Sequence, residues 1–255
     1  MLLRGKINHR LCWVIANVFA CSFATGYFMT VNLRLLTIEI VGTFVIFGLA
    51  LFLAAGTVVW PSGWAFLILF SGFTIALTRW LLRHNPGLLT ERMTGIGKPN
   101  QPAWDRVFFV VVELFFLAWL VLMPLDAVRF RWSQMPGWLQ VVGAVLLLCS
   151  FYLFFLTFRE NPYLSPAVRI QTERGQTVIS TGPYQYVRHP MYAGVIPLVV
   201  GTTFLLGSWY GLLGLILVFG IAFRAVREER VLRLELPGYD AYMARVKYRS
   251  IPYVW

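Results

Sequence analysis

The stretch MYAGVIPLVVGTTFLLGSWYGLLGLILVFGIAFRAV, residues 191–226, decides the fold. It contains no charged residue before Arg224. A helix needs about 20 apolar residues to cross a bilayer, so the stretch is too long for a single crossing. GSWYG at 207–211 provides a turn inside it. We therefore expect two antiparallel helices, 191–206 and 210–226, that form a tight hairpin.

The rest of the chain is similarly apolar. Of its 255 residues, 58% are hydrophobic and only 13% are charged, and the mean hydropathy is +0.69. Soluble domains usually carry about 25% charged residues, so lipid is the expected environment. Apolar runs of helix length predict further spans at 38–57, 62–82, 107–124 and 138–158. The predicted fold is an all-α, polytopic integral membrane bundle with a cytoplasmic C-terminal cap.

Basic residues gather in three segments, 79–106, 159–189 and 224–255. The connections at 58–61 and 207–211 carry no basic residue. Because cytoplasmic loops are enriched in Lys and Arg, the three basic segments are expected to face the cytoplasm together. This bias accounts for the net charge of +11. The expected partner is therefore the lipid bilayer, with no nucleic acid, and the expected location is a membrane with the basic segments on its cytoplasmic side.

The apolar stretch at 11–31 fits this topology less well. If it spans the membrane, it places Arg4, Lys6 and Arg10 on the outer side, against the charge rule. Three alternatives stay open: an interfacial helix, a span that tolerates the wrong charge, or a cleaved signal segment. In each of them the segment is an appendage to the remaining bundle.

Several functional classes lack the residues that they need. The three cysteines and three histidines are scattered without ligand spacing, so no metal site is expected. The sequence has no HExxH, P-loop or GxSxG motif. Within the predicted spans upstream of Arg224, the only acidic residues are Glu39 and Glu113. A transporter or channel usually needs more intramembrane charge, so that reading is weakly supported.

Polar residues instead concentrate at one end of the predicted hairpin, in 159–190 and 223–255. Because the hairpin returns the chain to the depth at which it started, we expect His189 to lie beside Arg224–Glu229. Pro190 suits the first turn of a helix, and the residue before a proline is held in an extended conformation. The hairpin therefore predicts one polar site built from two distant segments.

The last helix offers two pairs of opposite charge, Arg224 with Glu228 and Glu229 with Arg233. Residues four apart share a helical face, and such pairs add about 0.2–0.5 kcal/mol each. Taken alone, this pattern also describes an interfacial helix whose long side chains reach toward lipid headgroups. Its coincidence with the histidine and tyrosines of the preceding loop favours a functional site.

These segments resemble a known family. GPYQYVRHPMYAG at 182–194, REERVL at 227–232 and PGYDAYMARVKYRSIP at 237–252 are similar to the bacterial branch of the isoprenylcysteine carboxyl methyltransferase family. That family belongs to a wider group with phospholipid and thiol methyltransferases. The shared signature is R-H-P-x-Y, an apolar hairpin and E-E-x-x-L, met here by Arg188–Tyr192 and Glu228–Leu232.

The resemblance implies an enzyme that uses S-adenosylmethionine as methyl donor and releases S-adenosylhomocysteine. It implies that Arg224 positions the acceptor and that Glu229 belongs to the catalytic signature. The implied cofactor contacts are Gln176, Thr177, Val178, Ile179, Tyr184, Arg188, His189, Pro190, Met191, Tyr192 and Glu228. The expected division of the chain is an appendage at 1–37, a transmembrane bundle at 38–158 and a methyltransferase core at 159–255.

The chemistry of these residue types agrees with that assignment. Aromatic faces suit a sulfonium cation, and a carboxylate such as Glu228 suits an ammonium or ribose hydroxyls. A carboxylate acceptor is already ionised and needs no base, and Arg224 can hold it in bidentate fashion. A thiol or phospholipid amine needs deprotonation, for which only His189 or Glu229 is at hand. We therefore expect methyl transfer to a lipophilic or small acceptor, with a carboxylate favoured; the alternatives are a silent membrane scaffold or sensor, or a small-molecule transporter.

Overall fold

The apolar runs form long helices that lie side by side. The computed structural model describes residues 31–95, 97–98 and 101–255. The long helices are α2 (Leu33–Ala55), α3 (Pro61–His84), α5 (Ala103–Pro124), α6 (Gly137–Glu160), α7 (Pro190–Leu206) and α8 (Leu215–Glu235). The shorter elements are α4 (Pro86–Met93), α9 (Tyr239–Arg245), a π-helical turn (Leu125–Phe130) and 3₁₀ turns at Thr172–Arg174, Gly182–Gln185 and Trp209–Gly214. No strand occurs within these described ranges.

Each of the six predicted spans corresponds to a helix. Five helices are long and apolar enough to cross a membrane, when α5 is continued to Phe130 and α8 is extended back to Trp209. The helix α7 has 17 residues and is shorter. The prediction of an all-α membrane bundle is confirmed. The doubtful stretch at 11–31 lies outside the described residues.

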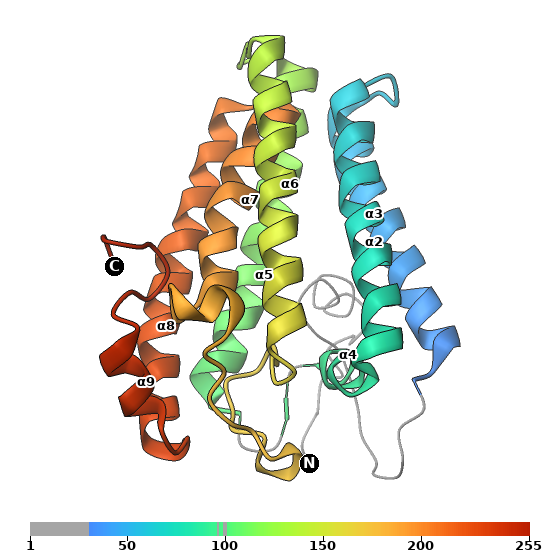
Figure 1. Cartoon of the computed structure of the whole chain (residues 1–255). Helices are drawn as coiled ribbons and strands as arrows, with labels where there is room; N and C mark the ends of the chain where they lie inside the picture. Colours follow the sequence, from blue (N-terminus) through green and yellow to red (C-terminus); the bar gives the residue numbers. More distant parts are fainter. Residues whose placement is uncertain (1–30, 96, 99–100) are drawn as a thin grey trace, which may run out of the picture.

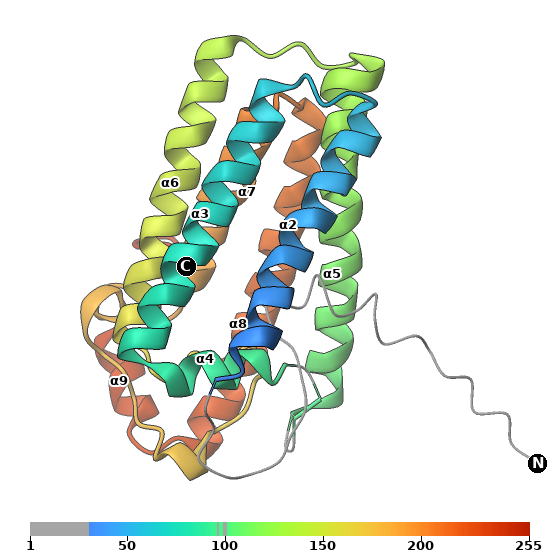
Figure 2. The same ribbon diagram turned by 90° about the vertical axis from the view of Figure 1, so that its right-hand side faces the viewer.

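The long helices run alternately up and down the bundle (Figure 1). In both views α4, α9 and the connection between α6 and α7 lie at the same end of the bundle (Figure 2). We call the end formed by α4, residues 161–189 and α9 the polar end. The basic segments of the sequence therefore share one end, as the alternation of the spans predicts.

The helices α6 and α7 pack backbone against backbone. A Cβ atom at Gly143 would lie 2.3 Å from the backbone nitrogen of Leu205, and one at Gly201 would lie 2.7 Å from that of Leu147. Only glycine fits at such close approaches. The contact is closed by Ser150, whose hydroxyl donates a hydrogen bond to the carbonyl of Gly194 at 2.7 Å. These two helices therefore form one rigid pair.

Apolar side chains lie both inside and outside the bundle. Phe47, Phe66 and Leu120 are buried in the main core. Large apolar side chains on the outer surface include Leu53 and Phe219, which are 69% and 75% exposed. A water-soluble bundle would cover its outer surface with polar residues instead. The exposed apolar surface is thus the face expected toward lipid.

At the end opposite the polar end, Asp126 fixes the turn of the hairpin. Its carboxylate is fully buried and accepts hydrogen bonds from the hydroxyls of Ser133 and Ser208, each at 2.5 Å. The Ser208 hydroxyl also accepts from the backbone nitrogen of Gly211 at 3.2 Å. The turn between α7 and α8 is therefore held to the end of α5.

Candidate active site

The first wall of the site is the turn that precedes α7. Gly182 has φ +56°, and a Cβ atom there would lie 2.4 Å from the Cγ atom of Glu160. This conformation and this contact together require glycine. The turn buries Tyr184, whose hydroxyl accepts a hydrogen bond from Asn161 at 2.8 Å. A tyrosine of the sequence motif is thus fixed by the residue that follows α6.

The start of α7 orients His189. Pro190 is the first residue of the helix, and His189 before it has a non-helical backbone with φ −126° and ψ 69°. The backbone nitrogen of His189 donates to the carbonyl of Arg249 at 2.7 Å. The imidazole ring stacks on the ring of Tyr192, with 5.1 Å between ring centroids and an interplanar angle of 8°. The histidine and tyrosine of the RHPxY motif therefore stack face to face and form one wall of the site.

Glu229 joins three basic side chains behind this wall. Its carboxylate accepts from Arg188 Nε at 2.6 Å and from Arg249 Nε at 2.8 Å, and it lies 3.3 Å from His189 Nε2. The Glu229 side chain is only 4% exposed. This arrangement ties α8, the RHPxY motif and the C-terminal segment together.

The expected helical pair between Glu229 and Arg233 is not formed. Glu229 turns toward the basic cluster just described, whereas Arg233 Nε bonds Asp240 at 2.8 Å on the surface. The expectation was wrong because a buried carboxylate gains more from two nearby guanidinium groups and an imidazole than from one exposed arginine on its own helix. The other pair is present, with Arg224 and Glu228 3.6 Å apart.

Arg224 is buried and held by several partners. Its Nε donates to Asp105 Oδ1 at 3.0 Å, one terminal nitrogen donates to the carbonyl of Pro166 at 2.6 Å, and the other donates to the hydroxyl of Tyr192. That hydroxyl in turn donates to Glu228 Oε2 at 2.5 Å. A guanidinium has five N–H donors. Each terminal nitrogen of Arg224 thus keeps one N–H without an acceptor among the described residues.

Asp105 is a residue of the candidate site that the sequence reasoning missed. It lies in the first turn of α5 and is 0% exposed. While its Oδ1 holds Arg224, its Oδ2 accepts from the side chain of Gln101 and from the backbone nitrogen of Val168, both at 2.9 Å. One carboxylate therefore links α5, α8 and the loop at 161–170. The only sequence signal was an acidic residue beside an apolar run, because 119 positions separate it from Arg224.

Two cavities meet at this site. The first, of about 100 Å³, lies at the polar end between the loop at 161–179, the start of α7 and α8. The second, of about 200 Å³, lies within the bundle and is largely apolar, with eight phenylalanines in its lining. Both cavities are lined by Met191, Tyr192 and Arg224. These three residues form the shared wall.

The structure brings nearly all of the expected site residues together. Every one of the expected cofactor contacts lines the first cavity, and so does Arg224. Glu229 does not line it, because its carboxylate faces the basic cluster behind the wall. The residues that line the first cavity are Gln176, Thr177, Val178, Ile179, Tyr184, Arg188, His189, Pro190, Met191, Tyr192 and Glu228, with others from the loop and α9.

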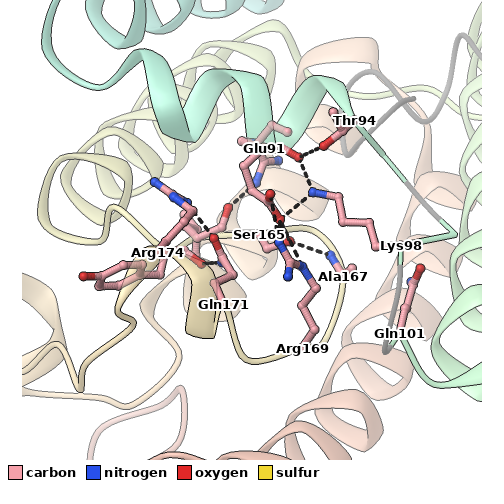
Figure 3. Close-up of polar contacts among 12 residues, drawn as sticks. Glu91, Thr94, Lys98, Gln101, Ser165, Ala167, Arg169, Gln171 and Arg174 are labelled. Atoms are coloured by element: carbon pink, nitrogen blue, oxygen red, sulfur yellow. Dashed lines mark hydrogen bonds and ion pairs between the residues drawn. The ribbon is translucent and has the colours of Figure 1, made fainter. Parts of the chain in front are cut away.

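A charged network holds the loop over the first cavity (Figure 3). Glu91 of α4 bonds Arg169 at 3.0 Å, accepts from the hydroxyl of Ser165 at 2.9 Å and pairs with Lys98. Arg169 also bonds Glu173 at 2.7 Å. Burial favours the protonated form of Glu91, but the hydrogen bond and charge of Lys98, with the charge of Arg169, outweigh it and lower the pKa of this carboxyl. The network therefore fastens the loop to α4.

Replacing Glu91 by glutamine is expected to lower the free energy of unfolding by about 1.5–3 kcal/mol near neutral pH, because charge-assisted hydrogen bonds are lost. Since the folded-state pKa of Glu91 lies below its ordinary value, this stability is present above the ordinary value and is lost as pH falls through the folded one. Thermal unfolding in detergent should therefore show a gap between wild type and variant that closes on acidification. Glu173→Gln, at a side chain 54% exposed, is the control, with an effect below about 1 kcal/mol. A gap that stays constant with pH contradicts the assignment.

The lining of the first cavity offers the groups that S-adenosylmethionine would need. The stacked rings of His189 and Tyr192 present an aromatic face for a sulfonium. The Glu228 carboxylate lines the cavity and suits an ammonium or ribose hydroxyls. The hydroxyl of Tyr239, also in the lining, is buried and has no hydrogen-bond partner within the described ranges. This hydroxyl is therefore free to bond a ligand in the cavity.

Comparison with known proteins gives a family for this part of the chain. Residues 138–234 match the family described as phospholipid methyltransferase. A search of curated proteins found no match. The matched region begins in α6 and ends in the last turn of α8, so it contains RHPMY and EERVL but neither Asp105 nor α9. Enzymes of this family generally use S-adenosylmethionine. Residues 138–234 therefore form a domain of the phospholipid methyltransferase family, within the group of membrane methyltransferases that includes the isoprenylcysteine carboxyl methyltransferases.

Proposed function

We propose that this protein transfers a methyl group from S-adenosylmethionine to a lipophilic acceptor that enters from the bilayer. The observation that carries the proposal is the shared wall of Met191, Tyr192 and Arg224 between a polar cavity and an apolar one. A water-soluble donor fits the first cavity, at the polar end. An apolar acceptor fits the second, within the bundle. The two reactants then meet at the wall.

The proposed roles follow from the contacts at the wall. S-adenosylmethionine supplies an activated methyl group on a positively charged sulfur. The Tyr192 hydroxyl bonds both Glu228, which lines the first cavity, and Arg224, which lines both, and Glu228 binds the donor. The loop fastened by Glu91 and Asp105 excludes water from the first cavity. Placing two reactants at the correct distance in this way can supply about 7–11 kcal/mol of the barrier.

A carboxylate is the acceptor group that we favour. It is ionised at neutral pH and needs no general base. The two N–H groups that Arg224 retains, one on each terminal nitrogen, can bind the two oxygens of a carboxylate. A thiol or a phospholipid amine must first lose a proton, and His189 is occupied by the Glu229 carboxylate. The name of the matched family makes the phospholipid amine the principal alternative.

The proposed orientation places the polar end in the cytoplasm of a bacterial cell, with the protein in the inner membrane. The three basic segments meet at this end, as the distribution of Lys and Arg in membrane proteins favours. We further propose that residues 159–255 form the catalytic core. Glu91 and Asp105 reach into it from the upstream bundle, so the core depends on 38–158 for its loop and for Arg224.

Binding of the donor is the first test. Detergent-purified wild type should bind S-adenosylmethionine and its demethylated product in calorimetric titration, and Glu228→Ala and His189→Ala should weaken that binding. Radiolabelled methyl transfer into a total lipid extract then identifies the acceptor class. Label that base treatment releases as methanol indicates an ester and thus a carboxylate, whereas base-stable label indicates a thiol or amine. Absence of donor binding by wild type, or unchanged binding in both variants, favours a silent scaffold and refutes the proposal.

A further inference from the structure

A second arginine lines the apolar cavity. Arg92, near the end of α4, contributes to its lining together with Phe158 and Pro166. The Arg92 guanidinium lies 4.7 Å from the centroid of the Phe158 ring. It donates one hydrogen bond, to the carbonyl of Leu164 at 3.0 Å. Within the described ranges, no carboxylate oxygen lies within 4 Å of it, in contrast to Arg224.

This environment is unfavourable for a cation without an anion. Burial lowers the pKa of Arg92 to about 10, although the nearby charge of Glu91 partly opposes this effect. A guanidinium has five N–H donors, and only one of those on Arg92 has a protein acceptor among the described residues. The Arg92 side chain is partly buried, and charges withdrawn from water in proteins are normally paired. Arg92 thus has no carboxylate partner within ion-pair distance among the described residues.

The same cavity holds one acidic residue that must be considered. Glu39 lines it from α2. The contacts of the Arg92 guanidinium are the Leu164 carbonyl and the Phe158 ring, so Glu39 and Arg92 form no ion pair within the described ranges. The other polar side chains in the lining, apart from Arg224 and the Tyr192 hydroxyl, are the threonines Thr43, Thr74 and Thr78, whereas Leu36, Leu89 and Met93 pack in one apolar cluster with Phe158. Arg92 is therefore the group in this part of the cavity best suited to an anionic ligand.

We propose that Arg92 binds the anionic group, a phosphate or carboxylate, of an amphiphile whose apolar part lies among the phenylalanines of the cavity. The inference rests on the proposed function in one respect, which is that this amphiphile is the methyl acceptor. The acceptor then carries an anionic group on Arg92 in addition to the group presented to Arg224. Two cationic positions in one apolar cavity select such molecules over neutral lipids of the same length.

The test compares two probes that differ only in charge, radiolabelled dodecyl phosphate and dodecanol, bound to the full chain in nanodiscs of zwitterionic lipid. After the partition of each probe into empty nanodiscs is subtracted, wild type should bind dodecyl phosphate at least about tenfold more tightly than dodecanol. Arg92→Gln should bring this preference close to one, and Arg92→Lys should retain part of it. Arg83→Gln is the matched control, because Arg83 is exposed at the same end of the bundle and does not line the cavity.

Each variant is also titrated with S-adenosylmethionine. Arg92 does not line the first cavity, so donor binding should be unchanged and reports correct folding. A preference that survives in Arg92→Gln, or that is lost only in Arg224→Gln, overturns the inference. Wild type that fails to bind the donor but keeps a preference dependent on Arg92 would refute the proposed function and leave this site standing.

A second measurement applies if Arg92→Gln does not fold. A photoreactive dodecyl phosphate with a diazirine beside the phosphate, bound to wild type, should label α4 or Phe158, which lie around the guanidinium. Labelling confined to the neighbourhood of Arg224 contradicts the inference. Competition by free inorganic phosphate at equal concentration should be weak, because the apolar chain supplies most of the binding. Full competition by free phosphate would show that the site binds the ion and not an amphiphile.

Discussion

Replacing Arg224 with glutamine is expected to lower the rate of methyl transfer by about 10²–10³-fold, as removal of a fixed hydrogen-bond donor from a reacting centre commonly does. S-adenosylmethionine should still bind, because Glu228 and the ring of His189 keep their places in the first cavity. The measurement is turnover with labelled donor beside calorimetric donor binding in the same preparation. Loss of both would instead assign Arg224 to donor binding.

The matched variant is Asp105→Asn. If Asp105 acts through Arg224, this change should lower turnover in wild type but cause no further loss in the Arg224→Gln background. For thermal stability, Asp105→Asn should raise the unfolding temperature when it is added to the Arg224→Gln variant. Arg224→Gln alone leaves the buried Asp105 carboxylate without its cation, so the double variant should unfold at a higher temperature than Arg224→Gln. Additive losses of turnover would show that Asp105 acts independently of Arg224.

Replacing Glu229 with glutamine is expected to destabilise the protein by about 3–5 kcal/mol, the usual cost of breaking a buried ion pair. The variant leaves Arg188 largely buried without the carboxylate that it bonds at 2.6 Å, and it also removes the partner of Arg249. Thermal unfolding in detergent measures the effect. Glu235→Gln is the control on the same helix, because Glu235 is exposed and forms no ion pair within the described ranges.

The same variant separates two roles of Glu229. If the residue positions the RHPxY motif, instability and weaker donor binding should appear together, since Arg188 and His189 line the first cavity. If Glu229 takes part in the chemical step, the variant should remain stable and bind the donor but lose turnover. We expect the first outcome, because the carboxylate does not line the first cavity.

The main features of the site could be predicted from the sequence because the membrane restricts the possible arrangements. A stretch of 33 residues without a charge, 191–223, must fold back, and the return brings His189 close to Glu229 although 40 positions separate them. The pre-proline histidine and the turn at Gly182 are local features of the chain. Local backbone preferences and the thickness of a bilayer were therefore sufficient to predict the hairpin, the conformation before Pro190 and the turn at Gly182.

The remaining contacts depend on packing that no local pattern encodes. Asp105 meets Arg224 because the long arginine side chain reaches from α8 to the first turn of α5. Helical spacing placed Glu229 beside Arg233, whereas burial directed it toward Arg188 and Arg249. Spacing along a helix reveals which residues share a face, but it does not reveal which neighbouring segment covers that face. Arg92 was overlooked for the same reason, since its environment comes from α6 and the loop.

The backbone contact between α6 and α7 has a consequence for motion. Gly143 and Gly201 leave no side chains at this contact that could change conformation, so the two helices cannot slide or separate without losing it. The wall that carries His189 and Tyr192 is therefore expected to stay fixed during a catalytic cycle. The helix α4 is instead held to the loop at 161–170 by side chains such as Glu91, whose bonds can break and re-form. The gate through which a lipophilic molecule enters is thus expected beside α4.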